Sequence, residues 1–274
     1  MTVRCAPISV IIPMFNSAGT IERALNSVAE QMLLPSEVFV VDDASSDQSR
    51  EIVTRWHNPA INVTLIEHST NLGPSASRNS GWVQATGEFV AFLDADDAWH
   101  PKKLSIQYRF MTEHETLAIC GHSYDIYKDT SKWPQIEETQ NYKTFDFKDF
   151  LIRNRLSTPT VMVKREIVDR FTETQRYSED YLLWLEIVKR YGHACFLELP
   201  LARLFKPAVS RSGLTSRTTA MYQGELSTMI SLFRSDHLGL WQMTIVITWL
   251  TVKFVRRRIK IALAKILRIT NVAT

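Results

Sequence analysis

Cysteine is scarce in this chain of 274 residues, and no histidine or cysteine spacing is typical of a metal site. The three cysteines, Cys5, Cys120 and Cys195, are odd in number and far apart, which excludes a disulfide framework and a zinc-binding pair. The seven histidines show no HxxxH spacing, so we expect them at the surface or in loops. Internal repeats and low-complexity segments are also absent. These absences favour a globular protein in a reducing compartment.

Acidic residues are missing from the end of the chain, where no Asp or Glu follows Asp236. The net charge of +3 arises there, and the rest of the chain is close to neutral, which argues against a nucleic-acid partner. A secretory signal is also missing, because only Arg4 precedes the first apolar run and Pro13 interrupts it. We therefore expect a cytoplasmic protein.

Two apolar runs end abruptly in acidic residues. Residues 89–93 lead into Asp94, Asp96 and Asp97, and residues 38–41 lead into Asp42 and Asp43. Ligands of open α/β sheets bind beyond the carboxyl ends of the strands. Adjacent carboxylates repel each other unless a cation holds them, and Mg²⁺ or Mn²⁺ binds through one or two carboxylates plus substrate phosphates. The pattern predicts a metal–nucleotide site, with solvated turn caps or helix N-caps as the alternative.

Strand-like and helix-like segments alternate over the first hundred residues. We expect strands at residues 8–12, 38–41, 63–67 and 89–93, and helices at residues 18–32, 48–56 and 75–85. This alternation predicts a mostly parallel sheet with right-handed crossovers. Beyond residue 117 we expect a polar loop at 127–148, short strands at 159–163 and 196–204, a helix at 181–190 and helical structure from residue 222 onward.

Five segments in order resemble the family 2 glycosyltransferases of the GT-A fold. They are residues 9–16 (SVIIPMFN), 42–47 (DDASSD), 71–79 (NLGPSASRN), 94–97 (DADD) and 178–184 (SEDYLLW). The resemblance covers residues 7–215. It implies an α/β fold with a Rossmann-like, mostly parallel central sheet flanked by helices, and an enzyme that transfers a sugar from a nucleotide sugar with inversion. On this basis we divide the chain into a catalytic domain at 1–215, with a nucleotide-sugar-binding half (1–117) and an acceptor-binding half (118–215), and a helical appendage at 216–274.

The resemblance also implies how the donor is held. The base of the nucleotide is expected near Pro13, Phe15 and Asp43. Arg78 is expected near the uracil or the phosphates, although a surface or structural ion pair is an alternative for this arginine. Asp94 is expected toward the ribose or the metal shell. Arg203, Arg211 and Ser212 are weaker candidates for contacts with the diphosphate.

Two further carboxylates are expected to carry the chemistry. The resemblance assigns Mn²⁺ or Mg²⁺ to Asp96, where the cation would stabilise charge on the leaving diphosphate. It assigns the role of general base to Asp180, which would take the proton of the acceptor hydroxyl. The alternative for Asp180 is an acid in the first turn of a helix, favoured by the helix dipole. Trp184 remains open as a platform for the acceptor or as a packing residue.

The carboxy-terminal segment predicts membrane contact. Residues 238–255 are largely apolar but short and interrupted by polar residues, which argues against a spanning helix. Residues 256–268 place apolar side chains near one face and basic side chains on the rest, as in a helix that lies on an anionic leaflet. The alternative is a solvated helix that packs on the body or on a second subunit.

The combined prediction is a hexosyl- or N-acetylhexosaminyltransferase at the cytoplasmic face of the cell membrane. It would use a UDP-linked sugar and a hydroxyl of a glycan or lipid-linked glycan acceptor, in surface polysaccharide or lipopolysaccharide biosynthesis. One alternative is a polyprenyl-phosphate sugar synthase. Another is a non-catalytic protein that binds nucleotide sugars or serves as a scaffold.

Overall fold

The structure is a computed structural model, which describes residues 5–126, 133–137, 141–205 and 218–270, the last of these (262–270) as helix backbone only. Its strands are β1 (Cys5–Met14), β2 (Leu34–Asp42), β3 (Val63–Glu67), β4 (Phe89–Phe92), β5 (Ala98–Trp99), β6 (Ile119–Ile126), β7 (Tyr142–Asp146), β8 (Met162–Lys164) and β9 (His193–Leu204). Its α-helices are α1 (Ile21–Ala29), α2 (Ser49–Arg55), α3 (Pro74–Gln84), α4 (Lys103–Glu113), α5 (Phe147–Ile152), α6 (Glu179–Tyr191), α7 (Thr218–Arg234) and α8 (Leu240–Thr270).

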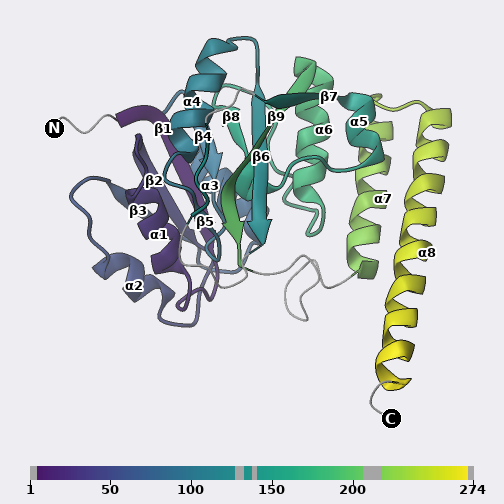
Figure 1. Ribbon diagram of the computed structural model, residues 1–274, viewed down its shortest axis with the longest axis horizontal. Helices are drawn as coiled ribbons and strands as arrows, with labels where there is room; N and C mark the ends of the chain where they lie inside the picture. Colours follow the sequence, from purple (N-terminus) through teal and green to yellow (C-terminus); the bar gives the residue numbers. More distant parts are fainter. Residues whose placement is uncertain (1–4, 127–132, 138–140, 206–217, 271–274) are drawn as a thin grey trace.

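Within the described residues, nine strands form one sheet (Figure 1). Eight of them follow the order β3-β2-β1-β4-β8-β6-β9-β5, and β7 pairs with β9. The first four strands are parallel, as are β6 and β9, whereas β8 runs antiparallel to both of its neighbours. The two halves predicted at residues 1–117 and 118–215 thus share a continuous sheet, and the boundary at residue 215 lies outside the described residues.

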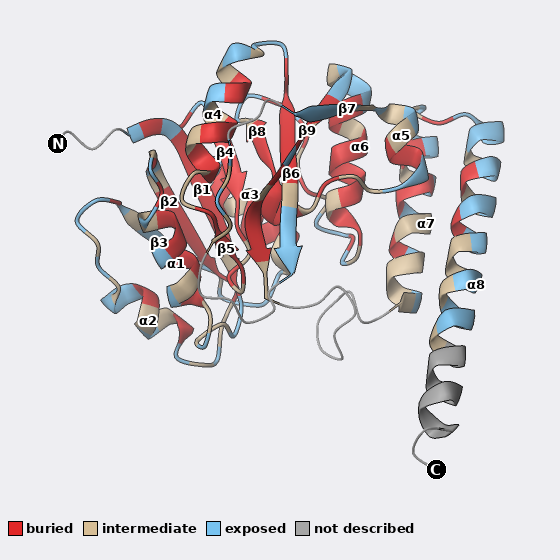
Figure 2. Ribbon diagram, viewed as in Figure 1, coloured by how far each residue is buried: buried red, intermediate tan, exposed pale blue. Residues whose placement is uncertain are grey.

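Helices cover both faces of the sheet, as the α/β prediction requires. One hydrophobic cluster joins α1, α2 and α4 to one face, through β1 residues such as Val10 and Ile12. The other joins α3 and α6 to the opposite face, through Ile11. Successive side chains of a strand point to opposite faces, so the uninterrupted apolar run of β1 supplies both clusters. The buried residues concentrate in the sheet and in the helix faces against it (Figure 2).

Helix α3 lies close to β1 because it carries a glycine at the contact. A Cβ atom on Gly81 would lie 2.7 Å from Cγ2 of Ile11, which is shorter than side chains tolerate. The absence of that atom allows the helix to approach the strand. The same approach fixes the distance between the amino end of α3 and the carboxyl end of β1, where the candidate site lies.

Helices α7 and α8 stand side by side at one edge of the molecule and confirm the predicted helical appendage (Figure 1). Leu250 of α8 is fully buried, and the ring of Phe254 stacks on that of Tyr222 in α7 with 4.5 Å between centroids. Among the described residues, no helix has the length and hydrophobicity that a bilayer crossing requires. Helix α8 is continuous, and it includes most of both segments that we distinguished in the sequence, 238–255 and 256–268.

Two local predictions beyond residue 117 are wrong. The expected loop at 127–148 contains β7 and the start of α5, although residues 127–132 and 138–140 lie outside the described part of the chain. Strand β7 is an edge strand whose residues are mostly exposed, and exposed edge strands carry polar side chains. Its composition therefore resembles that of a loop. The expected strand at 159–163 begins instead with a 3₁₀ turn, Thr158–Thr160, which contains Pro159, and β8 follows it. Proline has no N–H to donate to a sheet.

A group of polar side chains is fully buried between α4 and β6. Lys103, Gln107 and His122 are all inaccessible to solvent, so the surface position expected for every histidine is wrong for His122. The Nζ atom of Lys103 lies 3.8 Å from the centre of the Trp99 ring and has no hydrogen-bond partner. Burial lowers the pKa of His122 to about 3 and the pKa of Lys103 well below its usual value.

Candidate active site

The predicted site residues line one cleft of about 580 Å³ at the carboxyl ends of β1, β2 and β4. Seven of the candidates line it, from five separate segments: Pro13, Phe15, Asp43, Arg78, Asp94, Asp96 and Asp180. The wall that includes Asp180 consists of residues 157–159, 176–180 and Met221 of α7. Donor-side and acceptor-side candidates therefore face the same space.

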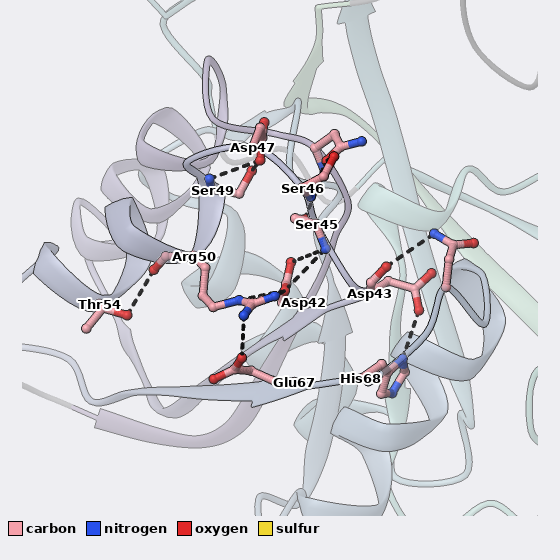
Figure 3. A network of polar contacts seen from close by, with 12 residues as sticks. Asp42, Asp43, Ser45, Ser46, Asp47, Ser49, Arg50, Thr54, Glu67 and His68 are labelled. Atoms are coloured by element: carbon pink, nitrogen blue, oxygen red, sulfur yellow. Dashed lines mark hydrogen bonds and ion pairs between the residues drawn. The ribbon is translucent and has the colours of Figure 1, made fainter.

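Asp43 connects the segments around the carboxyl end of β2. Its carboxylate accepts hydrogen bonds from the backbone N–H groups of Leu72 (2.8 Å) and Gly73 (2.7 Å). Gly73 has φ +94°, a conformation that favours glycine, and it caps α3. The ring of His68 lies 2.9 Å from the same carboxylate (Figure 3). Asp43 thus joins the end of β2 to the start of α3, and it is not the N-cap of α2 that the alternative proposed.

The loops after β1 and β2 hold each other. The side chain of Asn16 accepts a hydrogen bond from the backbone N–H of Ser46 (2.9 Å), and Ser45 Oγ accepts one from the backbone N–H of Asn16 (2.9 Å). Asp47 accepts hydrogen bonds from the N–H groups of Ala18 (3.0 Å) and Ser49 (3.0 Å). These contacts fix the turn that carries Phe15, whose ring is 49% exposed.

Asp42 has a structural environment. It is fully buried at the end of β2 and forms an ion pair with Arg50 of α2 at 3.1 Å, and Arg50 also contacts Glu67 at 3.1 Å (Figure 3). Asp42 does not line the cleft, whereas its neighbour Asp43 does. The two adjacent acids therefore have separate roles, because successive residues at a strand end point in opposite directions.

Two arrangements reduce the repulsion among the carboxylates that follow β4. Asp94 forms an ion pair with the guanidinium of Arg78 at 2.8 Å. Asp97 is buried and accepts a hydrogen bond from the backbone N–H of Phe205. Burial, followed by the charges of Asp94 and Asp96, raises the pKa of Asp97 to about 9, so this group is neutral at pH 7. Asp96 is partly exposed and lines the cleft, in a position to meet a cation.

The amino end of α6 supplies two acids to the cleft, Glu179 and Asp180. Ser178 precedes the helix in a left-handed conformation, φ +58°, which is strained for a residue with a side chain. Its Oγ atom is buried and has no hydrogen-bond partner. The side-chain amide of Gln175 donates to the carbonyl of Ser178 (3.2 Å) and to the carbonyl of Gly224 in α7 (3.2 Å). This amide ties the strained turn to α7.

Asp180 is held by neutral donors. Its carboxylate accepts hydrogen bonds from the backbone N–H of Tyr181 (2.7 Å), from Thr158 Oγ1 (3.3 Å) and from the Asn154 amide (3.4 Å). Burial raises the pKa of Asp180 above its ordinary value. Burial and the charge of Asp180 raise the pKa of Glu179 to about 7. A carboxylate that stays basic near neutral pH suits proton abstraction from a hydroxyl.

The residues present fit a hard divalent cation that is completed by a substrate. No group of three or more His, Cys, Asp and Glu side chains in the described residues is arranged to hold a metal by itself. Asp96 offers one carboxylate to the cleft, with Asp94 beside it. Mg²⁺ and Mn²⁺ sites commonly use one or two carboxylates together with phosphate oxygens, which a nucleoside diphosphate supplies.

Several candidates lie away from the cleft. Trp184 is fully buried against Phe92 and Phe171, with ring centroids 6.4 and 5.8 Å away, so it packs in the core and is not a platform for the acceptor. Arg203 lies over the ring of Trp133 in a neighbouring depression and does not line the cleft. The other two diphosphate candidates, Arg211 and Ser212, fall outside the described residues.

Other residues of the site had no signal of their own in the sequence. Asn154 lies in an irregular segment and Thr158 begins the 3₁₀ turn, and only the fold brings them to Asp180. Glu179 belongs to the segment at residues 178–184 that resembles the family. Its contact with Arg78 at 3.4 Å, however, joins positions 101 residues apart. The sequence indicated a role for Glu179 only through its position next to Asp180.

Comparisons with known proteins identify the family of the chain. The family model described as "Glycosyl transferase family 2" matches residues 9–172. A curated relative is the Escherichia coli UDP-Glc:alpha-D-GlcNAc-diphosphoundecaprenol beta-1,3-glucosyltransferase WfgD, 30% identical over 66% of this chain and 70% of its own length.

Solved structures share the fold. S. aureus TarS 1-349 in complex with UDP-GlcNAc gives a TM-score of 0.69 at 24% identity, over 88% of this chain and 70% of that one. The mannosyltransferase PcManGT from Pyrobaculum calidifontis, in complex with GDP-Man and Mn²⁺, gives a TM-score of 0.62 at 22% identity, over 85% of this chain and 65% of that one. The sequence match and the shared GT-A fold lead to one conclusion: the chain belongs to glycosyl transferase family 2 and is a glycosyltransferase.

Proposed function

We propose that the protein transfers a hexosyl or N-acetylhexosaminyl group from a UDP-sugar to a hydroxyl of a glycan or lipid-linked glycan, with inversion at the anomeric carbon. The observation that carries this proposal is that Asp96 and Asp180 line the same cleft. A metal-binding acid and a base in one cleft suit a single displacement, because the acceptor oxygen attacks on the side opposite the leaving diphosphate.

The donor would occupy the side of β1, β2 and α3. The exposed ring of Phe15 offers an aromatic face to the base, and Pro13 borders the same space. Asp43 would offer carboxylate oxygens to an N–H group of the base, and Arg78 and Asp94, which line the same cleft, would lie toward the ribose and phosphates. A uridine nucleotide is supported by the donor named for WfgD and by the UDP-GlcNAc named for the TarS complex.

Asp96 would hold Mn²⁺ or Mg²⁺ together with the diphosphate of the donor. When bound, such a cation stabilises the negative charge that gathers on the leaving diphosphate. The Mn²⁺ named for the PcManGT complex supports this choice of metal.

Asp180 would act as the general base. As the acceptor oxygen forms its bond to the anomeric carbon, the hydroxyl proton passes to the Asp180 carboxylate and the bond from that carbon to the phosphate oxygen breaks. The neutral donors Thr158 and Asn154 orient this carboxylate. Its raised pKa matches it to proton transfer near neutral pH.

The acceptor would be presented at a membrane surface, on the cytoplasmic side, in surface polysaccharide or lipopolysaccharide biosynthesis. WfgD, whose name gives a diphosphoundecaprenol-linked acceptor, supports this setting. Helix α8 supports it as well, because one side packs on the body while apolar side chains elsewhere on it are exposed. These are Leu240, Trp241, Ile245, Trp249, Val252, Val255 and Ile259, with Arg256, Arg258 and Lys260 exposed among the last of them. Apolar residues flanked by basic ones suit an anionic leaflet.

A thermal-shift panel tests the donor half of the proposal. UDP, UDP-sugars and GDP-sugars are added with Mn²⁺ to the wild type and to Asp96→Ala. We expect a UDP-sugar to raise the melting temperature of the wild type in a metal-dependent way, and the variant to lose most of that shift. If no nucleoside diphosphate stabilises the wild type, the proposal fails.

The alternatives make different predictions for the same chain. A polyprenyl-phosphate sugar synthase passes the sugar to a phosphate, which needs no strong base, so Asp180→Asn would keep much of its activity. We expect this variant to lose transfer while it keeps donor affinity. A non-catalytic binding protein would show no metal-dependent donor hydrolysis in the wild type, whereas the enzyme is expected to hydrolyse its donor slowly when no acceptor is present.

A further inference from the structure

One buried arginine connects the two sides of the cleft. The Nη2 atom of Arg78 lies 2.8 Å from Asp94 Oδ1 on the donor side, and its Nη1 atom lies 3.4 Å from Glu179 Oε1 on the acceptor side. The residue is 5% exposed, and its guanidinium lies 5.2 Å from the centre of the Phe171 ring. The planar guanidinium presents several donors in a fixed arrangement, so one side chain bonds both acids at once.

The charges around this arginine do not balance. Three carboxyl groups, Asp94, Glu179 and Asp180, act on its single positive charge. The charge of Arg78 opposes the burial that raises the pKa of Glu179 and of Asp180. Without it, desolvation would act on two adjacent acids with no nearby countercharge, and both would favour the protonated form.

We propose that Arg78 is a positioning residue that holds Asp94 and Glu179 in one ion-pair network across the cleft and keeps the neighbouring Asp180 ionised as the base. This inference rests on the proposed function, since it assumes that Asp180 accepts the proton of the acceptor. It assigns Glu179 a role as well: its negative charge beside Asp180 works against ionisation of the base, and Arg78 offsets that effect.

The other groups that face Asp180 do not replace this charge. The segment that precedes β8 contributes Thr158 and Asn154, which are neutral. Asp94, beyond the end of β4, and Glu179, in α6 itself, are both acids. The wall residue Arg176 is exposed, whereas Arg78 is buried, so the charge of Arg176 is screened by water.

The test measures kcat and the KM for the donor as functions of pH in Arg78→Gln, Arg78→Lys and Glu179→Gln. Removal of the arginine charge is expected to move the acid limb of kcat to higher pH by about one unit. Removal of the Glu179 charge is expected to move it to lower pH. Arg78→Lys is expected to keep the position of the limb but to lower kcat, because an ammonium group does not bond both acids in the same geometry.

Arg190→Gln is the matched control. Arg190 lies at the other end of α6, also paired with an acid, Asp169, at 3.1 Å, and it does not line the cleft. Its loss is expected to leave the pH profile unchanged. If Arg78→Gln does not fold, the expected shift of the limb to lower pH in Glu179→Gln, with no shift in Arg78→Lys, still decides the question.

Three outcomes overturn the inference. The first is an acid limb that stays in place in Arg78→Gln and Glu179→Gln, and the second is a shift of both in the same direction. The third is a rise in donor KM with an unchanged kcat profile, which would make Arg78 a donor ligand alone. Each of these leaves the proposed function intact when the wild type transfers sugar and Asp180→Asn does not. A wild type without transfer overturns both.

Discussion

His68 Nδ1 lies 2.9 Å from Asp43 Oδ1, so the residue after β3 supports the acid at the end of β2. The other ring nitrogen of His68 lies 2.9 Å from Ser80 Oγ in α3, which fixes the plane of the ring. The Asp43 carboxylate therefore keeps its orientation in the cleft through contacts from two segments, His68 and residues 72–73. His68 is not among the residues that line the cleft, so under the proposed function its effect on the donor would pass through Asp43.

The first prediction concerns this contact. His68→Phe keeps a ring of similar size but loses the hydrogen bond to Asp43, so the affinity for the nucleotide is expected to fall about tenfold, for one bond to a charged group. Because the acids of the reaction are untouched, kcat is expected to change less. Titration calorimetry with UDP measures the affinity. His57→Phe, an exposed histidine away from the cleft, is the control, and equal affinities for the two variants would contradict the prediction.

The pH dependence of turnover provides the second prediction. Burial raises the pKa of Asp180, so this group stays protonated to higher pH than an ordinary aspartate. A protonated carboxyl cannot accept the acceptor's proton, and turnover is therefore expected to rise with pH over a range above that of an ordinary aspartate. Glu179, with a pKa of about 7, titrates together with it. A kcat that is constant between about pH 5 and 8 would contradict this expectation.

A third prediction concerns stability and uses the buried Lys103. Its pKa lies well below the usual value, so the unfolded chain binds a proton that the folded chain does not. Lys103 therefore does not destabilise the folded protein above the unfolded pKa of about 10.5, where both states are deprotonated. As the pH falls below that value, the unfolded chain gains the proton and the free energy of unfolding decreases. Lys103→Met is expected to raise the free energy of unfolding by about 2 kcal/mol at neutral pH. It is also expected to flatten the dependence of that free energy on pH.

Urea unfolding at two pH values measures both effects. Lys102→Met, a partly exposed neighbour, is the control for the loss of a lysine charge. A variant that is less stable than the wild type would show that the lysine makes a favourable contact, such as the one with the Trp99 ring.

The fourth prediction concerns α8. Wild-type protein is expected to sediment with vesicles that contain anionic lipid, and the double variant Arg256→Glu, Lys260→Glu is expected to bind at least about tenfold less, at roughly 1 kcal/mol per basic residue. Trp241→Ala, which truncates a side chain that is 82% exposed, is expected to weaken binding to neutral and anionic vesicles alike.

The control double variant reverses exposed charges elsewhere, Arg55→Glu and Arg153→Glu. Equal losses in the two double variants would mean that net charge, and not α8, governs the binding. If the vesicles bind nothing and Trp241→Ala changes the oligomeric state in ultracentrifugation, the exposed residues of α8 contact a second subunit.

The donor half of the fold was predictable because its signals are local. Its strands were recognisable as short, mostly apolar runs, and acids follow two of them directly, so period and position were enough to expect acidic side chains at the strand ends. The separate roles expected for Asp43 and Asp96 came from the family resemblance. The acceptor half depends on long-range contacts. Strand β7 is polar and pairs with β9, which lies about fifty residues later in the chain. Considered without this distant partner, its composition is typical of a loop.

The same distinction applies within the site. The position of Asp180 followed from a recognised segment, but the meeting of Arg78 with Glu179 depends on how α3 and α6 pack on the sheet. Burial of Lys103 and His122 likewise depends on the packing of α4 over β6. A charged residue in an amphipathic segment gives no sign of which side of the segment the sheet will cover.

The strand order has a consequence for synthesis of the chain. Strands β3, β2, β1 and β4 all come from the first third of the sequence and pair with one another, so they are available to assemble while the rest is still being made. The next strand in the sheet is β8, at Met162–Lys164, and until it emerges β4 has an open hydrogen-bonding edge. During that interval the fully apolar β4 is a site at which another nascent chain can pair. The interleaved order thus makes the middle of the sheet, and not its rim, the point most exposed to misassembly.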